Sequence, residues 1–421
     1  MTAVITGAVL TLASAVLYAQ APPPPTPQDC VKLGREFTAK RQQELRPLTG
    51  EIVRQIDAER VKLLKACGGG FSVDRIAVDQ LPALVEFYQD SQQPDLAERA
   101  LARGLAAPTL PPATRGELLV NGIRAALRQR PKPDYAKAEG YSDALDELPA
   151  AAFDQKISGH GALNGYYRGD DVDAGIIKHS TWLMNAAKTA PPETRTKYAS
   201  SFLSAYVNLA EALAGQGEND KALNLLRRAT SELADLPKVE DRVKPVLARY
   251  ELVGKPAATI EAPVWINRGD SSTPIDLKGK VTLLQFTAHW CGPCKESYPG
   301  MTRLQQRFKD RGFQVVFYTR TYGHFETERN LPREQEIQRD RKYFAHYGFT
   351  HPIAIGSPSF VVVDGKQVYQ DDPVEKSYGV SAIPQITLVD AQGNVRLIMI
   401  GYDDANEERL AAFIEGLLKR T

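Results

Sequence analysis

Residues 281–299 read VTLLQFTAHWCGPCKESYP, and they decide how the C-terminal part of the chain folds. The first six residues are mostly apolar, interrupted only by Thr282 and Gln285, a pattern typical of a buried central strand. From Pro293 to Phe308 the spacing is helical, and Pro293 suits the first turn because proline lacks an N–H group that would go unused there. The stretch therefore predicts a strand that leads into a helix, with two cysteines at the junction.

The cysteines at this junction, Cys291 and Cys294, are placed for thiol–disulfide chemistry. Cys291 begins the predicted helix, where unpaired backbone N–H groups and the positive end of the helix dipole stabilise a thiolate, the nucleophilic form of cysteine. Gly292 and Pro293 form the tight first turn. Cys294 lies within disulfide reach on the same helix face and can resolve a mixed disulfide by attacking the sulfur of Cys291. The spacing therefore predicts a catalytic dithiol in which Cys291 attacks and Cys294 resolves.

A Cys-x-x-Cys pair has two other uses, as half of a zinc site or as a purely structural disulfide. A zinc site needs a second pair of Cys or His residues at ligand spacing. The six histidines are scattered and only His289 is close, so we expect no metal and no cofactor. His289 directly precedes Trp290. It is a candidate modulator of the thiolate, but we expect it to be exposed at the rim of the site.

The rest of the C-terminal part alternates between strand and helix patterns. We expect helices at 293–308, 333–346 and 407–418 and strands at 264–266, 281–286, 313–318, 352–355, 385–389 and 395–400, with a hairpin at 360–369. The hairpin turns about Asp364-Gly365, a dipeptide that favours a tight primed turn. The order β-α-β-(α)-β-β-α is that of an α/β thioredoxin fold.

Three motifs in this part carry a family resemblance. Residues 290–295, WCGPCK, resemble the thioredoxin active site, and residues 277–286, LKGKVTLLQF, are similar to the strand that precedes it in TlpA/ResA-like thioredoxins of bacterial envelopes. Residues 378–384, YGVSAIP, match the loop that holds the cis-proline of the family, and Pro299 matches the proline that kinks its active-site helix. About residues 254–421 thus resemble a TlpA/ResA-like thioredoxin-family thiol–disulfide oxidoreductase.

The resemblance implies roles for further residues around the cysteines. It implies that Pro384 follows a cis peptide bond against the disulfide, and that the backbone of Ile383 pairs with a substrate strand. Trp290 and Pro384 would shape the substrate groove, together with Gly292 and Pro293. An Ile-Pro sequence alone does not establish a cis bond, which is the minority isomer even before proline.

The chain departs from thioredoxin proper at Gln285. Thioredoxin has a buried aspartate there that accepts the proton of the second cysteine. In this chain that proton acceptor for Cys294 is absent, and Gln285 is a candidate modulator of the cysteine pair. The TlpA/ResA-like branch often has a neutral amide at this place and can use a glutamate elsewhere. Glu326 and Glu328 lie in the long loop at 321–331, and neither aligns with that role.

The remaining cysteines, Cys30 and Cys67, flank a segment with the pattern of a helical hairpin. Helical spacing runs over 31–46, breaks at 47–50, resumes over 51–66 and ends at three glycines, as helix ends prefer. Two antiparallel helices of similar length bring the start of one beside the end of the other. We therefore expect a structural disulfide between Cys30 and Cys67; two unrelated thiols or a second redox pair are the alternatives.

From residue 71 to residue 250 the pattern is helical, with proline-rich loops between the helices. Residues 206–229 have apolar and small residues at helical spacing on both sides of a short polar loop, and they resemble a tetratricopeptide unit. Residues 96–105 and 135–148 are weaker relatives at irregular spacing. Such repeats usually form a surface for another protein, so we expect either a partner-docking region or a helical support for the neighbouring domain.

The N-terminus indicates export. Residues 3–18 are almost all apolar or small and lead to Ala19-Gln20-Ala21, which is typical of a secretory signal cleaved after Ala21. No Lys or Arg precedes this run, so an uncleaved anchor is the alternative. The 52 basic and 51 acidic residues leave a charge of +1, which argues against a nucleic-acid partner. We expect a periplasmic or otherwise exported protein.

These observations predict four regions and one activity. The regions are a signal peptide at 1–21, a linker and disulfide-stapled hairpin at 22–70, a helical repeat-like domain at 71–250 and a thioredoxin-like domain at 251–421. The predicted activity is reduction of protein disulfides by the Cys291–Cys294 dithiol, with a membrane thiol carrier as electron donor. The alternatives are a disulfide oxidase or isomerase that uses the same cysteines, and an interaction protein in which the helical repeats recruit a client.

Overall fold

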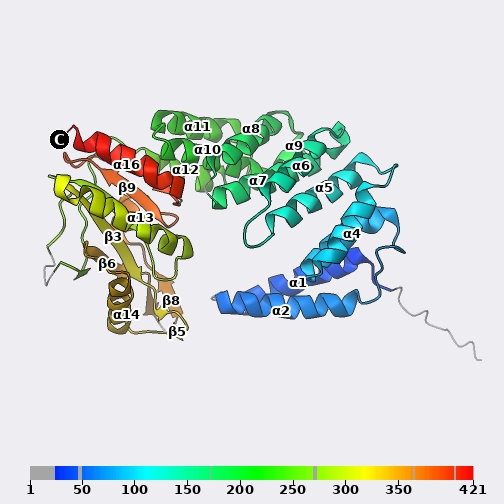
Figure 1. Ribbon diagram of the computed structural model, residues 1–421, viewed down its shortest axis with the longest axis horizontal. Helices are drawn as coiled ribbons and strands as arrows, with labels where there is room; N and C mark the ends of the chain where they lie inside the picture. The colour runs from blue at the N-terminus through cyan, green and yellow to red at the C-terminus, as the bar shows by residue number, and fades with distance from the viewer. Residues whose placement is uncertain are drawn as a thin grey trace, which may run out of the picture. The chain divides into compact units, whose positions relative to one another are not determined.

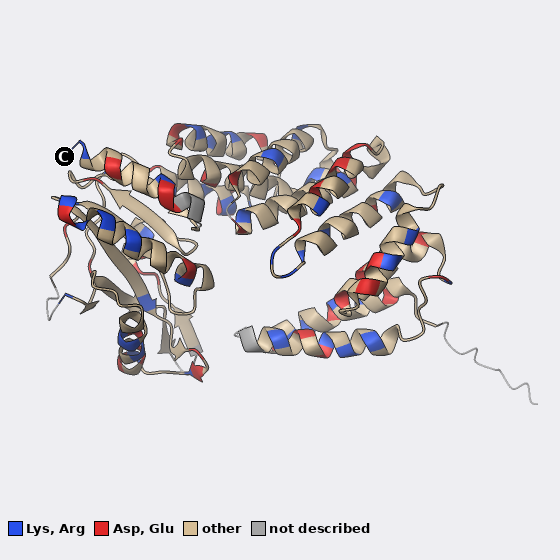
Figure 2. Cartoon of the chain, in the orientation of Figure 1, with Lys and Arg blue, Asp and Glu red and all other residues tan. Residues whose placement is uncertain are grey.

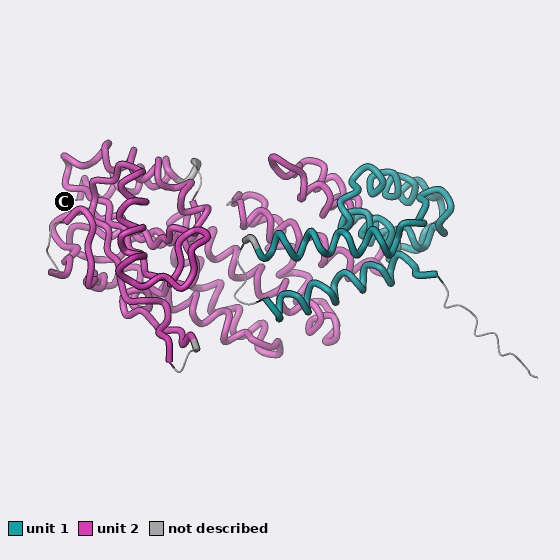
Figure 3. Tube along the Cα trace, turned by 90° about the horizontal axis from the view of Figure 1, so that it is seen from below, with its two compact units in different colours: residues 1–121 teal, residues 122–421 magenta. Residues whose placement is uncertain are grey.

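The computed structural model describes residues 24–45, 50–170, 172–268, 273–363, 366–402 and 404–420. The chain divides into two compact units, an N-terminal unit of residues 1–121 and a C-terminal unit of residues 122–421 (Figure 3). The predicted signal peptide lies outside the described residues, and the four predicted regions stay a prediction. Among the helices that are described, none is long and apolar enough to span a bilayer. Basic and acidic side chains are interspersed in both units (Figure 2).

The N-terminal unit is helical. Its elements are α1 (Pro27–Glu44), α2 (Gly50–Cys67), η1 (Val78–Gln80), α3 (Leu81–Asp90) and α4 (Pro94–Leu105), followed by α5 (Pro112–Leu127), in which the boundary between the units falls. Helices α1 and α2 pack on each other, and a Cβ atom on Gly34 would lie 3.0 Å from the Leu64 side chain, so glycine allows the close approach. Cys30 and Cys67 form a disulfide with Cα atoms 5.8 Å apart.

We expect removal of the Cys30–Cys67 disulfide to destabilise the N-terminal unit. The bridge closes a loop with a sequence separation of 37 residues, and closing such a loop restricts the unfolded chain by about 3–4 kcal/mol. Replacing both cysteines by alanine should lower the free energy of unfolding by about that amount. Urea unfolding followed by circular dichroism measures it, with the Cys291→Ser/Cys294→Ser double variant as control. A loss below about 1 kcal/mol would contradict the structural role.

The C-terminal unit begins with a layer of helices (Figure 1). After α5 they are α6 (Tyr135–Asp146), η2 (Ala150–Ala152), α7 (Phe153–Gly169), α8 (Asp173–Thr189), α9 (Pro192–Lys197), α10 (Ala199–Gly215), α11 (Asn219–Glu232) and α12 (Val239–Tyr250). Helix α7 packs on α8, α8 on α10, α10 on α11 and α11 on α12. Small residues lie buried in these helices, among them Ala205, Ala210, Ala222 and Ala229. The predicted all-helical region is confirmed, whereas its likeness to tetratricopeptide units stays a prediction.

A six-stranded mixed sheet follows, with strand order β1-β6-β3-β2-β9-β10. Its strands are β1 (Val264–Ile266), β2 (Val281–Phe286), β3 (Phe313–Thr321), β6 (Ile353–Pro358), β9 (Gln385–Val389) and β10 (Val395–Ile400). β2 and β3, and β3 and β6, are parallel pairs, while the remaining neighbours are antiparallel. Alternate side chains of each strand face opposite ways, so the sheet has a core on each face.

Helices complete the layers around this sheet. They are α13 (Gly292–Phe308), η3 (Lys309–Arg311), α14 (Arg333–His346), α15 (Pro373–Ser377) and α16 (Asp404–Leu418). Side chains of α13, α14 and α16 join the core on one face, and side chains of α15, of residues 257–265 and of Ile275 and Leu277 join the core on the other. The α/β thioredoxin fold predicted for the C-terminal part is confirmed.

The structure adds elements that the sequence pattern did not predict. The loop expected at 321–331 contains a small hairpin of β4 (His324–Phe325) and β5 (Glu328–Arg329), and β3 runs on to Thr321. The strands of this hairpin are two residues long, too short to show an alternating pattern. The expected hairpin at 360–369 is present as β7 (Phe360–Val363) and β8 (Lys366–Tyr369), and its predicted turn at 364–365 lies outside the described residues.

The helical layer and the sheet of the C-terminal unit are joined by a packed, polar seam. Helix α10 packs on β10, and Val395 and Ile398 of that strand belong to the same core as the helices. The Arg249 side chain is buried at the end of α12. Its Nη1 atom lies 2.9 Å from Glu211 Oε1, and its Nε atom donates a hydrogen bond of 3.0 Å to the carbonyl of Gly379. Arg249 also donates to Ser381, so one helical residue holds a loop of the sheet domain.

Burial of His351 should make the stability of the C-terminal unit depend on pH. Its ring packs 4.4 Å from that of Phe317, and burial lowers the pKa of His351 to about 4. Between pH 6.5 and 4 the unfolded chain therefore binds more protons than the folded chain, so stability is complete above pH 6.5 and is lost as the pH falls through 4.

Between pH 7 and pH 5 we expect the free energy of unfolding of the wild type to fall by about 2 kcal/mol more than that of His351→Leu. Urea midpoints at the two pH values measure this difference. His346→Leu, which removes an exposed histidine, should leave the pH dependence of the wild type unchanged. Equal slopes for wild type and His351→Leu would contradict the prediction.

Candidate active site

Cys291 and Cys294 lie where β2 gives way to α13, and the structure joins them in a disulfide with Cα atoms 5.2 Å apart. Cys291 is the N-cap residue of α13, and its Sγ atom accepts a hydrogen bond of 3.2 Å from the backbone N–H of Cys294. Cys294 has no exposed surface, while Cys291 retains 4%. Access is therefore narrow, and it leads to Cys291 first. The attacking and resolving roles of these cysteines stay predictions.

The loop before β9 lies against this disulfide. The peptide bond between Ile383 and Pro384 is cis, and the carbonyl oxygen of Ile383 is 3.8 Å from the Cys291 Sγ atom. Trp290 is 48% exposed and its ring meets that of Tyr322 edge to face, with centroids 5.2 Å apart. Gly292 and Pro293 are also exposed. The residues predicted to shape a substrate groove are thus gathered around Cys291.

Gln285 lies beneath the cysteines, fully buried in β2. Its Nε2 atom donates a hydrogen bond of 2.8 Å to Ser297 Oγ, which in turn donates one of 2.7 Å to the carbonyl oxygen of Cys294. Gln285 therefore reaches the backbone of Cys294 through Ser297. An amide at this place supports the helix by hydrogen bonding and does not take up a proton.

The C-terminal region is similar in sequence to known proteins. Residues 253–414 match the family model described as Redoxin. These residues form a Redoxin domain. Over 145 residues the chain is 26% identical to the thiol-disulfide oxidoreductase ResA of Bacillus anthracis, an alignment that covers 34% of this chain and 65% of that protein. Over 134 residues it is 28% identical to the thioredoxin-like protein YneN of Bacillus subtilis (strain 168), covering 32% and 64%.

The chain thus spans just under two thirds of the length of these relatives. Among solved structures, a thioredoxin-family thiol:disulfide interchange protein from Chlorobium tepidum TLS is 22% identical with a TM-score of 0.27, over 39% of this chain and 95% of that one. The predicted resemblance of the C-terminal region to ResA-like thioredoxin-family proteins is confirmed.

His289 is buried in the Redoxin domain. The prediction that it is exposed at the rim of the site was wrong, because His289 is only 3% exposed. Its ring stacks on that of Phe325 with centroids 4.7 Å apart, and its Nδ1 atom lies 3.4 Å from Asp340 Oδ1. The β4–β5 hairpin and α14 bury it. Both are remote in the sequence, so the residues next to His289 gave no sign of this burial.

Two buried carboxylates of α14 in the Redoxin domain were not predicted. Glu336 accepts hydrogen bonds from the backbone N–H groups of Tyr322 at 2.6 Å and Gly323 at 2.7 Å, and burial raises its pKa to about 7. Burial also raises the pKa of Asp340. The signal available in the sequence was spacing, since Glu336, Asp340 and the buried Phe344 recur every four residues and share one helix face.

The two glutamates of the loop at 321–331 are not among these buried carboxylates. Glu326 and Glu328 are both exposed, and Glu328 forms an ion pair of 2.9 Å with Arg339. Neither is placed among the buried groups behind the cysteines.

A groove of about 1000 Å³ in the C-terminal unit is lined both by residues of the helical layer and by residues next to the Cys291–Cys294 pair. One wall includes Pro131, Lys132 and Pro133 of the segment before α6, Tyr135 at its start, and Arg168 of α7. The other wall includes Pro293, Ile383 and Pro384. The groove therefore joins helical residues with those predicted to shape the substrate site.

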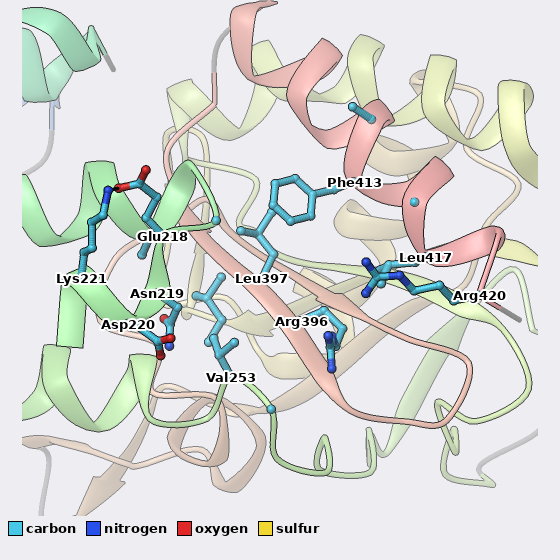
Figure 4. A pocket seen from close by; sticks show the side chains of 16 residues that line it. Glu218, Asn219, Asp220, Lys221, Val253, Arg396, Leu397, Phe413, Leu417 and Arg420 are labelled. Atoms are coloured by element: carbon cyan, nitrogen blue, oxygen red, sulfur yellow. Dashed lines mark ion pairs between the residues drawn. The ribbon is translucent and has the colours of Figure 1, made fainter. Parts of the chain in front are cut away.

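A second cavity, of about 800 Å³, lies among α11, β10 and α16 (Figure 4). Phe413, Leu397 and Val253 form its apolar lining, and Lys221 pairs with Glu218 at 2.7 Å on the side of α11. Its lining contains none of the predicted site residues.

Proposed function

We propose that this protein is an exported thiol–disulfide oxidoreductase that reduces protein disulfides through Cys291 and Cys294. The observation that carries the proposal is the position of the Cys291 sulfur. It caps the N-terminus of α13, receives the N–H of Cys294 at 3.2 Å, and lies 3.8 Å from the carbonyl of Ile383 beside the cis-proline. Backbone N–H groups and the helix dipole favour negative charge at such a place, and the thiolate is the form of cysteine that attacks disulfides.

The reaction follows from the arrangement of the two sulfurs. In the reduced protein the Cys291 thiolate attacks one sulfur of a client disulfide, so a mixed disulfide forms and the other client sulfur leaves as a thiolate. Cys294 then gives up its proton and attacks the Cys291 sulfur. The client's second thiolate leaves, and the Cys291–Cys294 disulfide forms. Two electrons pass from the dithiol to the client, and a dithiol donor, which we propose is a membrane thiol carrier, must return them.

Reduction is the direction that we propose for this exchange. Gly292-Pro293 between the cysteines and Ile383 before the cis-proline resemble reducing thioredoxins more than strong oxidants. The measurement that decides is the reduction potential of the Cys291–Cys294 couple, from equilibration with glutathione. We expect a value near that of thioredoxin, about −270 mV, and a value near about −120 mV would identify an oxidase.

We also infer that the helical layer forms one wall of the client site. The groove supports this, because Pro131, Lys132 and Tyr135 face the same space as Pro293 and Pro384. A folded client that presents a disulfide to Cys291 would contact the helical wall, whereas a small disulfide would not. Charge reversal at the exposed Lys132 should therefore raise KM for a protein substrate and leave that for a small aromatic disulfide unchanged. Lys188→Glu, on an exposed residue outside the groove, is the matched control.

A trapping experiment tests the proposed function as a whole. Cys294→Ser should hold clients on Cys291 as mixed disulfides, which are recovered from native expression and released by reductant. The Cys291→Ser/Cys294→Ser variant is the control. Absence of covalent adducts, together with an unchanged phenotype of the double variant, would favour the interaction-protein alternative.

A further inference from the structure

We propose that His289, Glu336 and Asp340 form a binding site for one divalent transition-metal ion of the zinc class. His289 lies on the loop between β2 and α13, and the two carboxylates lie one turn apart on α14. No metal was expected from the sequence, because a zinc site needs a second pair of Cys or His residues and only His289 is close to the cysteines. His289 is 47 positions before Glu336 and 51 before Asp340. The fold brings them together.

The geometry of the cluster fits shared ligation. One ligand atom from each residue lies within 4.8 Å of the others. His289 Nδ1 and Asp340 Oδ1 are 3.4 Å apart, which is longer than a good hydrogen bond of about 2.7–3.2 Å. Two ligand atoms about 2.0–2.1 Å from one zinc ion at the tetrahedral angle lie about 3.3–3.4 Å apart. The spacing of His289 and Asp340 therefore fits two ligands of one ion as well as a long ion pair, while the third ligand atom is known only to lie within 4.8 Å.

The burial of the cluster points to a missing partner. The three residues are 3%, 0% and 1% exposed, in the order His289, Glu336 and Asp340. Apart from their 3.4 Å contact with each other, the ring nitrogens of His289 and the carboxylate oxygens of Asp340 have no hydrogen-bond partner among the described residues. Leaving such polar groups buried without full hydrogen-bond or ionic partners is unfavourable, and most of all for a charged carboxylate. A cation coordinated between them would satisfy both.

Charge and ligand type narrow the choice of ion. A neutral imidazole with two carboxylates carries a charge of −2, which one divalent cation balances. Nitrogen with carboxylate oxygen suits zinc, iron and manganese, whereas calcium takes six to eight oxygen ligands. A fourth position can be filled by water or by His324, whose buried Nδ1 atom has no partner among the described residues and whose ring centroid lies 5.3 Å from that of His289.

A bound ion would tie the active-site loop to α14. His289 is two residues before Cys291, and Glu336 holds the backbone N–H groups of Tyr322 and Gly323 at the start of the β4–β5 hairpin. The ion would thus join the loop, the helix and the hairpin. This proposal does not depend on the direction of thiol exchange.

Metal binding is tested on the full chain in its oxidised form, so that all four cysteines are in disulfides and none can ligate. After treatment with a chelator and dialysis, Zn²⁺ and Mn²⁺ are titrated calorimetrically, with Ca²⁺ for comparison. We expect one site per chain that prefers Zn²⁺ to Ca²⁺, and a higher thermal midpoint with Zn²⁺. Asp340→Asn and His289→Asn should each weaken Zn²⁺ binding by about tenfold or more.

Glu334→Gln is the matched control, because Glu334 is exposed on the same helix and the change removes the same charge. It should bind Zn²⁺ like the wild type. If Asp340→Asn does not fold, the stoichiometry and thermal shift of the wild type still decide. Wild-type protein that binds no Zn²⁺, or that loses binding equally in Glu334→Gln, would overturn the proposal.

Discussion

Replacing Cys291 by serine should lower the rate of protein-disulfide reduction by at least about 1000-fold. A serine hydroxyl at the N-terminus of α13 stays protonated, and it cannot form the mixed disulfide with the client that the reaction requires. Cys294 cannot take over the attack, because it has no exposed surface beneath Cys291. The rate is measured with a protein disulfide as substrate and a small dithiol as electron source.

The control for this loss is Cys30→Ala/Cys67→Ala, which removes the other cysteine pair and should keep the wild-type rate. Cys294→Ser should behave differently from Cys291→Ser, since it still attacks once and then stays bound to its client. A Cys291→Ser variant that retains a tenth of the activity would contradict the assignment of the attacking sulfur.

Replacing Arg249 by methionine should destabilise the C-terminal unit by about 3 kcal/mol. Methionine fills similar space but leaves one oxygen of the partly buried Glu211 carboxylate, the Gly379 carbonyl and the Ser381 hydroxyl without their donor. Glu211 keeps a second partner, Arg168 at 2.8 Å, which limits the loss. The urea midpoint of unfolding measures the effect.

Arg242→Met is the matched control, because Arg242 lies exposed on the same helix and its guanidinium donates hydrogen bonds to serine hydroxyls, Ser200 at 3.2 Å and Ser204 at 3.0 Å. Its loss should be below about 0.5 kcal/mol. The Gly379–Ser381 loop leads to the cis-proline, so Arg249→Met should also raise KM for protein substrates. Equal stability of the two variants would show that the buried arginine does not hold the seam together.

Local pattern was enough to predict most elements of the Redoxin domain. The predicted helix at 333–346 coincides with α14, and the predicted strands at 281–286, 385–389 and 395–400 coincide with β2, β9 and β10. These segments carry their own signal, in apolar runs or helical spacing bounded by turn residues. The β4–β5 hairpin was missed because its strands are too short to show alternation.

The sequence pattern was not enough to predict which polar side chains are buried. The burial of His289 depends on Phe325 and Asp340, and the role of Arg249 depends on Gly379, 130 residues away. Charged residues on a helix are usually solvated, so the spacing of Glu336 and Asp340 with Phe344 was the only sign that this face of α14 is buried.

The sequence by itself determined where the cysteine pair lies in a strand–helix junction, because the spacing of two cysteines and the start of a helix are properties of neighbouring residues. Only the tertiary structure decided which sulfur can be reached, which carboxylates share a buried site with His289, and which helical residues face the cis-proline. These depend on burial and on contacts between distant segments. Such contacts form only when the layers pack, since burial is a property of the whole fold.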